Sequence, residues 1–248
     1  MSLLKRIVRR LRPAFYESPS VREQRRLFYS QFVRAGDLVF DVGANLGNRT
    51  EAFLALGARV IAVEPQEECV KTLRQRFASR SMLSVEPVAL GARESQATLH
   101  LTSVSTIATI SPEFIEATRE SGRFAAYEYS NRRTVRMTTL DSLAQRYGGP
   151  AFIKIDVEGF EPEVLSGLTK RPPTLRALSF EFTPELFENT ELCLRQIAAL
   201  GVTRGNYSLG ETMTLALESD VSIDELSRKL AQIVAPEVFG DVYVRWDP

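Results

Sequence analysis

The sequence of 248 residues is poor in the side chains that build metal sites and disulfide frameworks. It contains two cysteines, Cys69 and Cys193, and a single histidine, His100. The cysteines lack the close spacing of a zinc or redox motif, so we expect two reduced, buried thiols of a cytoplasmic protein. His100 falls in a predicted hairpin strand, away from the ends of the central strands, and is therefore a poor candidate for a general base.

Excess charge of one sign and long apolar runs are also missing. The 31 Lys and Arg residues balance the 31 Asp and Glu residues, which gives a formal net charge of zero. Because nucleic-acid-binding proteins usually carry a basic field, this balance predicts that no nucleic acid is bound. No apolar run reaches the length of a membrane-spanning helix. With 44% hydrophobic residues, the composition is that of a globular protein with a sizeable core.

Residues 1–36 are predicted to form a basic, helical amino-terminal extension. Within residues 1–13, apolar residues recur at helical spacing with five basic residues among them. This pattern can bind weakly to an anionic membrane surface or to a partner, and the alternative is a short helix packed on its own domain. The basic residues also interrupt the apolar stretch that a signal peptide needs. The predicted location is therefore the cytoplasm, with contact to the inner face of the membrane left open.

Residues 37–248 alternate between apolar strands and amphipathic helices, which predicts one α/β domain with a doubly wound, mostly parallel sheet. The Ser- and Thr-rich stretch 102–133, which carries an aromatic cluster, interrupts the alternation. An insertion of this length usually forms a lid or a binding loop. The expected strands cover residues 38–42, 59–63, 82–90, 151–157, 175–182, 202–207 and 241–246.

The first functional motif is an apolar strand that ends in Asp41 and leads through a glycine turn into a helix. The next strand ends in Glu64, and the two acidic ends together predict a nucleoside pocket at one edge of a parallel sheet. Asn45 stands where a dinucleotide motif has its second glycine, so a pyrophosphate would fit poorly. S-adenosylmethionine has no phosphate: Asp41 could meet its ammonium group, and Glu64 both ribose hydroxyls.

The second motif is a strand whose carboxyl end is crowded with charge. Lys154 and Asp156 share one side of this strand by the two-residue period, and Glu158 follows at its mouth. Glu181 ends the following strand, and ligands bind at this edge of open α/β sheets. The simpler alternative is a structural ion pair between Lys154 and one of the carboxylates. Asp156 and Glu181 could together hold Mg²⁺ or Ca²⁺, but no spacing in the sequence defines a metal site.

These motifs resemble the FkbM family of S-adenosylmethionine-dependent methyltransferases. The matching pieces are D-V-G-A-N-L-G at 41–47, V-E-P at 63–65, V-A-L-G at 88–91, T-L-D-S-L at 139–143, and I-K-I-D-V-E-G at 153–159 followed by Glu161. Pro87 departs from similar sequences, which often have Asn there. The resemblance implies a seven-stranded sheet with the last strand antiparallel, and a cofactor bound by residues of the matched motifs: Asp41, Gly43, Ala44, Asn45, Gly47, Asn48, Glu64, Pro65, Val88, Ala89 and Leu90.

The resemblance also implies methyl transfer to a hydroxyl of a sugar, a glycan or a secondary metabolite. An alcohol must lose its proton, so a base is needed, and with His100 discounted it should be a carboxylate. We expect Asp156 in this role, with Glu181 or Glu158 as alternatives and Lys154 holding the carboxylate or polarising the acceptor oxygen. Two other functions stay open: an NAD(P)-dependent oxidoreductase on a similar sheet, and a non-catalytic nucleoside-binding protein. The oligomeric state is not predicted.

Overall fold

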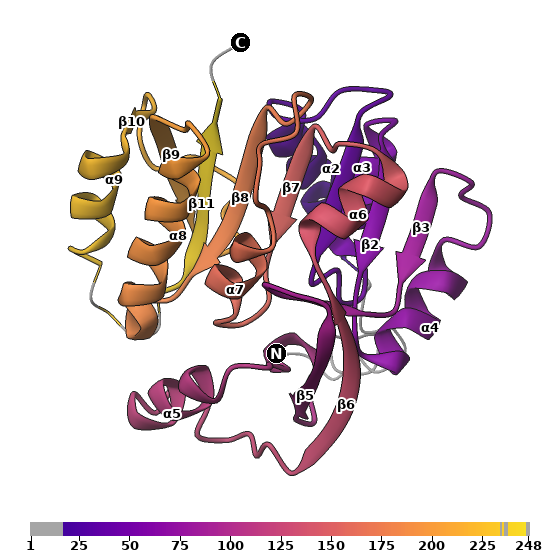
Figure 1. Ribbon diagram of the computed structural model, residues 1–248, viewed down its shortest axis with the longest axis vertical. Coiled ribbons are helices and arrows are strands. Elements are labelled where there is room, and N and C mark those ends of the chain that lie inside the picture. Colours follow the sequence, from indigo (N-terminus) through magenta and orange to yellow (C-terminus); the bar gives the residue numbers. More distant parts are fainter. Residues whose placement is uncertain (1–16, 234, 236–237, 247–248) are drawn as a thin grey trace, which may run out of the picture.

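The computed structural model describes residues 17–233, 235 and 238–246, and its centre is a twisted sheet between two layers of helices (Figure 1). The strand order is β10-β9-β11-β8-β7-β1-β2-β3, and β11 runs antiparallel to both of its neighbours. The predicted α/β fold is confirmed, and β10 adds a two-residue eighth strand at the edge. The strands are β1 Leu38–Val42, β2 Arg59–Val63, β3 Leu83–Glu86, β7 Phe152–Ile155, β8 Ala177–Phe182, β9 Arg204–Leu209, β10 Val221–Ser222 and β11 Gly240–Arg245.

Helices cover both faces of this sheet, which is why its central strands are nearly continuous apolar runs. One face packs against α2 Pro19–Tyr29, α3 Asn48–Ala55 and α4 Glu67–Arg76. The other face packs against α6 Leu140–Tyr147, α7 Glu161–Ser166, α8 Phe187–Ala199 and α9 Ile223–Leu230, with the short η2 Pro184–Leu186 before α8. Helix α2 belongs to the predicted amino-terminal extension, and it packs on the sheet through Phe28 and Tyr29.

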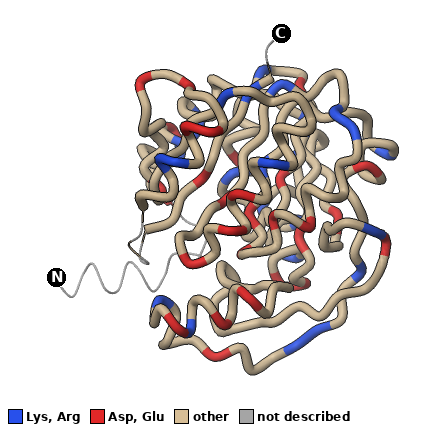
Figure 2. Tube along the Cα trace, turned by 60° about the vertical axis from the view of Figure 1, so that its left-hand side comes forward, with Lys and Arg blue, Asp and Glu red and all other residues tan. Residues whose placement is uncertain are grey.

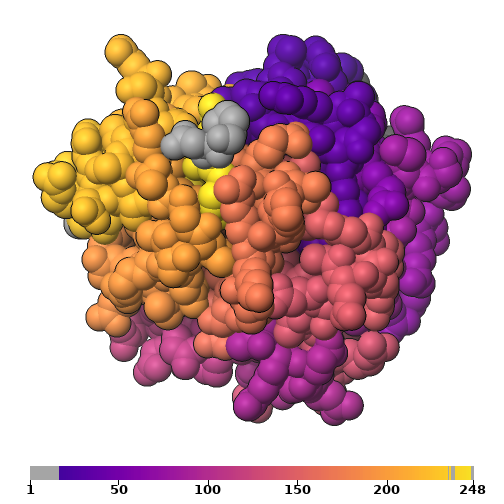
Figure 3. Space-filling model, turned by 45° about the horizontal axis from the view of Figure 1, so that its top comes forward, coloured from indigo at the N-terminus to yellow at the C-terminus, as the bar shows by residue number. Residues whose placement is uncertain are grey.

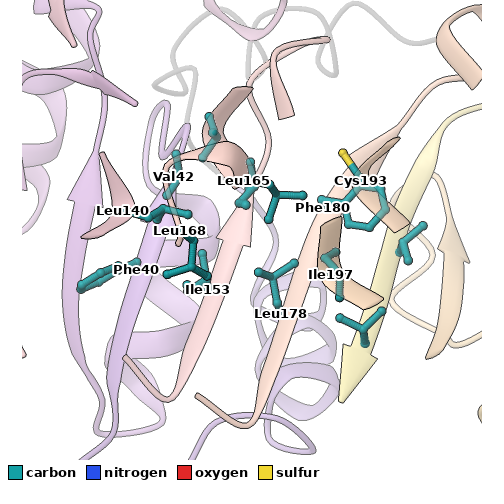
Figure 4. Packing of buried hydrophobic residues seen from close by; sticks show 14 of the residues in the cluster. Phe40, Val42, Leu140, Ile153, Leu165, Leu168, Leu178, Phe180, Cys193 and Ile197 are labelled. Carbon is teal, nitrogen blue, oxygen red and sulfur yellow. The ribbon is translucent and has the colours of Figure 1, made fainter. Parts of the chain in front are cut away.

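The larger core lies between the strands and helices α6 to α9. Figure 4 shows side chains of neighbouring strands, such as Phe40, Ile153 and Leu178, facing helix side chains such as Leu165 and Ile197. All five are at most 1% exposed. Burying a side chain of this size contributes roughly 1.5–3 kcal/mol, so this packing fixes the positions of the strand ends that carry the charged residues.

The expected strand over residues 82–90 is divided in two. Strand β3 ends at Glu86, and β4 Ala89–Leu90 leaves the main sheet. It joins β5 Ser95–Leu101 and β6 Asn131–Thr138 in a second sheet with the order β4-β6-β5. Pro87 stands between the two pieces, and because proline has no N–H group it cannot continue the hydrogen bonding of a strand. The prediction of one strand was wrong for this reason.

The predicted insertion forms a separate layer at the carboxyl ends of the parallel strands (Figure 1). Residues 102–133 contain η1 Ser105–Ile107, α5 Pro112–Glu120 and the first residues of β6 Asn131–Thr138, and β5 Ser95–Leu101 precedes them in the same layer. At the opposite end of the body, Figure 3 shows segments from early, middle and late parts of the chain packed side by side. Because ligands bind at the carboxyl ends of the strands in this class of fold, the insertion marks the end of the molecule at which a site is expected.

In the described part of the chain, no helix has both the length and the apolar character needed to cross a membrane. Residues 1–13 lie outside the described residues, so their contact with a membrane surface or a partner stays a prediction.

Candidate active site

A cavity of about 530 Å³ lies between the carboxyl ends of β1, β2, β7 and β8 and the insertion. Its size falls within the usual range of small-molecule sites, roughly 300–1,000 Å³. Acidic positions, shown in red in Figure 2, gather near the centre of the body beside the insertion. The residues of both predicted motifs meet here, at the sheet edge where ligands bind in this class of fold.

The glycine turn after β1 brings three strand ends together. Gly43 has a φ of +78°, and a Cβ atom added to it would lie 1.7 Å from the carbonyl oxygen of Asp156. The N–H groups of Gly43 and Ala44 both donate to the carbonyl of Val63, at 3.0 and 3.1 Å. Only glycine therefore allows the ends of β1 and β7 to approach this closely.

Glu64 is held in place by the backbone at the end of β2. Its two carboxylate oxygens each accept one N–H at 2.8 Å, from Asn45 and from Gln66, and the side chain is 2% exposed. Burial raises the pKa of Glu64 to about 7, although these two N–H donors oppose the shift. Each oxygen keeps a second lone pair that can accept from a hydroxyl, so the geometry fits a bound ribose.

Asp41 lies next to this turn and is buried. Its Oδ2 accepts from the Thr50 hydroxyl at 2.5 Å, and its other oxygen can accept from a ligand ammonium. Burial raises the pKa of Asp41, while the Lys154 ammonium opposes the rise. A cationic ligand group beside Asp41 would favour the ionised carboxylate further.

Most of the predicted cofactor residues line the cavity. They are Asp41, Gly43, Ala44, Asn45, Asn48, Glu64, Pro65, Val88, Ala89 and Leu90. Val88 to Leu90 join Leu99 and Ile107 in an apolar wall that suits a nucleobase. Gly47 is not among the residues that line the cavity. Its N–H donates to the Ala44 carbonyl, and a Cβ at this position would lie 2.6 Å from Leu73 of α4. Its local role is to let the turn pass close to α4.

Lys154 lies at the centre of the charged end of the cavity. The side chain is 1% exposed, and its ammonium donates to Asp156 Oδ2 at 2.6 Å. Burial alone would lower the pKa of Lys154, but the charges of Asp156 and Asp241 raise it above its ordinary value. The lysine is therefore a buried cation that needs these carboxylates to remain charged.

Asp156, Glu158 and Glu181 converge beside this lysine. Their carboxylate oxygens lie within 4.8 Å of one another, a spacing that a hard cation could bridge. Burial opposes ionisation of Asp156, but the positive charges of Lys154 and Arg49 lower its pKa. Burial and the neighbouring carboxylates raise the pKa values of Glu158 and Glu181 well above their ordinary range. The cluster therefore combines one ionised carboxylate with two carboxyl groups that hold their protons more firmly.

The loop that carries Glu158 is fixed from two sides. Glu158 has a φ of +56°, which few non-glycine residues adopt. Glu161 Oε1 accepts from the N–H groups of Val157 and Gly159, at 2.9 and 3.4 Å, and Thr109 Oγ1 of the insertion donates to the Glu158 carbonyl at 2.6 Å. The insertion therefore helps to hold the charged end of the cavity in shape.

The outer wall contains residues that the motifs did not identify. The Arg123 guanidinium lies 5.0 Å from the ring centre of Phe124 and 5.1 Å from that of Phe239, and it also pairs with Glu185 at 3.4 Å. The aromatic cluster of the insertion indicated Phe124, but Phe239 stands just before the last strand and no local signal indicates it. Arg49 and Glu211, which are paired at 2.5 Å, also line the cavity, and no local sequence signal indicates them either.

A comparison with known protein families decides the class of this site. The model of the methyltransferase FkbM domain matches residues 41–199. The chain belongs to this family. Its match begins at Asp41 and includes both charged strand ends, so the FkbM resemblance inferred from the motifs is confirmed.

The FkbM chain also shares a short segment with curated methyltransferases. It is 48% identical over 50 residues to ribosomal RNA small subunit methyltransferase A of Anaeromyxobacter sp. (strain K), which is 20% of this chain and 18% of the relative. This match contradicts the prediction that no nucleic acid is bound. A net charge of zero is a sum over the whole chain, and it does not exclude local groups of exposed basic side chains, such as Arg132 and Arg136 of β6.

Solved structures with a similar arrangement are distant in sequence. Precorrin-6y C5,15-methyltransferase from Geobacter metallireducens GS-15 has a TM-score of 0.47 and 9% identity, covering 96% of this chain and 93% of that chain. Aeropyrum pernix fibrillarin, solved with natively bound S-adenosyl-L-methionine, has a TM-score of 0.42 and 13% identity, covering 86% of this chain and 68% of that chain.

The FkbM protein is therefore a methyltransferase that uses S-adenosylmethionine. The cofactor supplies a methyl group on a sulfonium, for in-line transfer to a nucleophile. The residues present fit this cofactor: Glu64 could accept from the ribose hydroxyls, Asp41 could pair with the ammonium, and the apolar wall could contact the adenine. The oxidoreductase and the non-catalytic alternatives are not supported by the family match, and the carboxylates at both ends of the cavity would repel a pyrophosphate.

Proposed function

We propose that this FkbM protein transfers the methyl group to a hydroxyl oxygen of a sugar, a glycan or a secondary metabolite. The observation that carries the proposal is the position of Asp156, ionised beside Lys154 in the cavity wall at the end of β7, with β1 between it and the strand that carries Glu64. A hydroxyl nucleophile must give up its proton as the new bond forms, and a carboxylate at hydrogen-bond distance can accept it.

Asp156 and Glu181 have different roles in this proposal. Lys154 keeps Asp156 ionised, so Asp156 accepts the proton of the acceptor hydroxyl. Glu181 has a raised pKa, and its carboxyl group lies within 4.8 Å of that of Asp156, so in its neutral form it can donate to Asp156 and orient it in the resting site. Lys154 stabilises the pair in either protonation state, because its own pKa is raised.

Water exclusion contributes to the proposed reaction. The insertion residues Ile107 and Thr109 are buried and line the cavity with Phe124. Charge is neutralised as a sulfonium reacts with an oxygen nucleophile, and a site that excludes water favours such a change. Alignment of acceptor and donor supplies a further part of the rate, up to about 7–11 kcal/mol in intramolecular reference reactions.

The acceptor can be identified by comparing the source organism with a strain that lacks the gene. Mass spectrometry of surface glycans, small metabolites and RNA should reveal a glycan or metabolite that is lighter by one CH₂ group in the deletion strain. The purified protein should then restore that group in vitro. A loss confined to RNA, or to a carbon or nitrogen position, would refute the proposed chemistry while leaving the cofactor assignment intact.

A further inference from the structure

Asn45 joins three parts of the site that are far apart in the sequence. It has a φ of +48°, its N–H donates to Glu64 Oε2 at 2.8 Å, and its side-chain carbonyl accepts from Ser105 Oγ at 2.9 Å. The first two features belong to the glycine turn and the ribose carboxylate. The third reaches across the cavity to η1 in the insertion.

Ser105 is held from a second direction by the end of β2. Gln66 Nε2 donates to the Ser105 carbonyl at 2.9 Å, and Gln66 is only 9% exposed. Ser105, Thr106 and Ile107 all line the cavity at the end that contains Glu64. Residues 105–107, here called the strap, therefore lie over the nucleoside end and are attached to both strand ends that bind the nucleoside.

The residue type at position 45 points to this attachment. A left-handed backbone is least costly for glycine, and the turn itself uses only the backbone of residue 45. Asn45 Oδ1 accepts from Ser105 Oγ at 2.9 Å and, more weakly, from Cys69 Sγ at 3.8 Å. The amide oxygen is therefore used by the strap and by Cys69 of α4, and not by the turn.

We propose that the hydrogen bond between Asn45 and Ser105 is a positioning contact that keeps the strap closed over the cofactor and sets how fast the cofactor leaves. The inference rests on the cofactor of the family, and it does not depend on the acceptor or the base proposed above. A hydrogen bond of this kind contributes about 0.5–1.5 kcal/mol, so its loss should speed dissociation about 2- to 12-fold.

The test compares Asn45→Gly, Ser105→Ala and the double variant by surface plasmon resonance with S-adenosylmethionine and S-adenosylhomocysteine. Asn45→Gly keeps a residue that tolerates the left-handed turn, and Ser105→Ala removes only the hydroxyl. Each single variant should dissociate faster than wild type, and the double variant should dissociate no faster than the faster single variant. Additive effects, or wild-type rates in both single variants, would overturn the proposal.

Two controls separate this role from a general loss of structure. Ser103→Ala removes an exposed hydroxyl from the same segment and should leave the dissociation rate unchanged. Ser105→Thr restores a hydroxyl and should recover most of the wild-type rate. Hydrogen exchange of residues 105–110 in the ligand-free protein should increase in Ser105→Ala, while the thermal midpoint stays close to that of wild type. If the wild-type protein binds neither compound, that result contradicts the cofactor assignment itself, and not only the proposed role of the strap.

Discussion

Asp41 of β1 and Lys154 of β7 are register partners in the parallel sheet. The carboxylate assigned to the cofactor ammonium and the lysine that holds the proposed base therefore lie in the same row of one sheet face. This placement explains why Lys154 opposes the burial that raises the pKa of Asp41. In the proposed mechanism, cofactor binding and proton transfer therefore depend on the same buried cation, and changes at Lys154 should affect both.

Replacing Lys154 by Met should destabilise the protein by about 3–5 kcal/mol at pH 8, because buried carboxylates lose their cation. In wild type, the pKa of Asp156 is lowered. Its carboxylate therefore stabilises the folded protein at pH values above the ordinary pKa of aspartate, and this stabilisation is lost as the pH falls. In the variant, no lysine lowers the pKa of Asp156. The folded protein then becomes less stable as the pH rises, because its buried carboxyl groups ionise without a cation beside them. The difference in free energy of unfolding should therefore be larger at pH 8 than at pH 5.

Urea unfolding at the two pH values measures this difference. The double variant Lys154→Met with Asp156→Asn removes one of the orphaned charges and should recover part of the loss at pH 8. A destabilisation of equal size at both pH values would mean that Lys154 acts through packing alone.

The strand ends could be predicted from the sequence because each is a local pattern. Apolar runs that end in Asp41, Glu64 and Asp156 alternate with amphipathic helices, and parallel strands bring their carboxyl ends to one edge. The packing of Leu73 against Gly47 needed the tertiary structure, since glycine in a turn indicates conformational freedom but not which neighbour approaches.

The contacts that complete the site are long-range and carry no local signal. Phe239 and Asp241 reach the cavity and Lys154 only because β11 inserts antiparallel between β8 and β9. Ser105 meets Asn45 across 60 residues through a fold of the insertion that its polar composition does not specify. Hydrophobic periodicity defines which residues are buried within one element, whereas pairing between distant elements depends on the whole fold.

Glu64→Gln should weaken the binding of S-adenosylmethionine about 12- to 160-fold at pH 8, since hydrogen bonds to a charged acceptor are worth about 1.5–3 kcal/mol. The pKa of Glu64 is about 7 in the free protein, and the ribose hydroxyls favour its ionised form. Wild-type affinity should therefore rise with pH from 6 to 8, and that rise should be reduced in the variant.

Isothermal titration calorimetry across this pH range provides the test. Titration of the cofactor's own amino group affects both proteins equally, so the difference between the two curves reports Glu64. Identical pH profiles for wild type and Glu64→Gln would exclude a titrating contact with the ribose.

Asp156→Asn should reduce turnover about 100- to 10,000-fold if Asp156 is the general base. Glu181→Gln should reduce it much less, because glutamine resembles the protonated carboxyl group that its raised pKa favours. Both variants should bind S-adenosylmethionine nearly as well as wild type. Turnover is measured as S-adenosylhomocysteine formed with the acceptor found by the deletion comparison, and the opposite order of the two effects would assign the base to Glu181.

Gly43→Ala should be far more destabilising than Gly36→Ala, although both glycines have a positive φ, +78° and +84°. A Cβ at Gly36 meets no atom of the described residues within 4 Å, so this variant carries only the backbone cost of about 1–2 kcal/mol. A Cβ at Gly43 would lie 1.7 Å from the Asp156 carbonyl and must push the ends of β1 and β7 apart. The free energy of unfolding measured in urea should be lower for Gly43→Ala than for Gly36→Ala by at least about 1–3 kcal/mol, the usual cost of overpacking. Because the displaced end of β7 carries Asp156, Gly43→Ala should also lose turnover in the folded fraction, whereas equal stability and activity of the two variants would show that the close approach of these strands is not required.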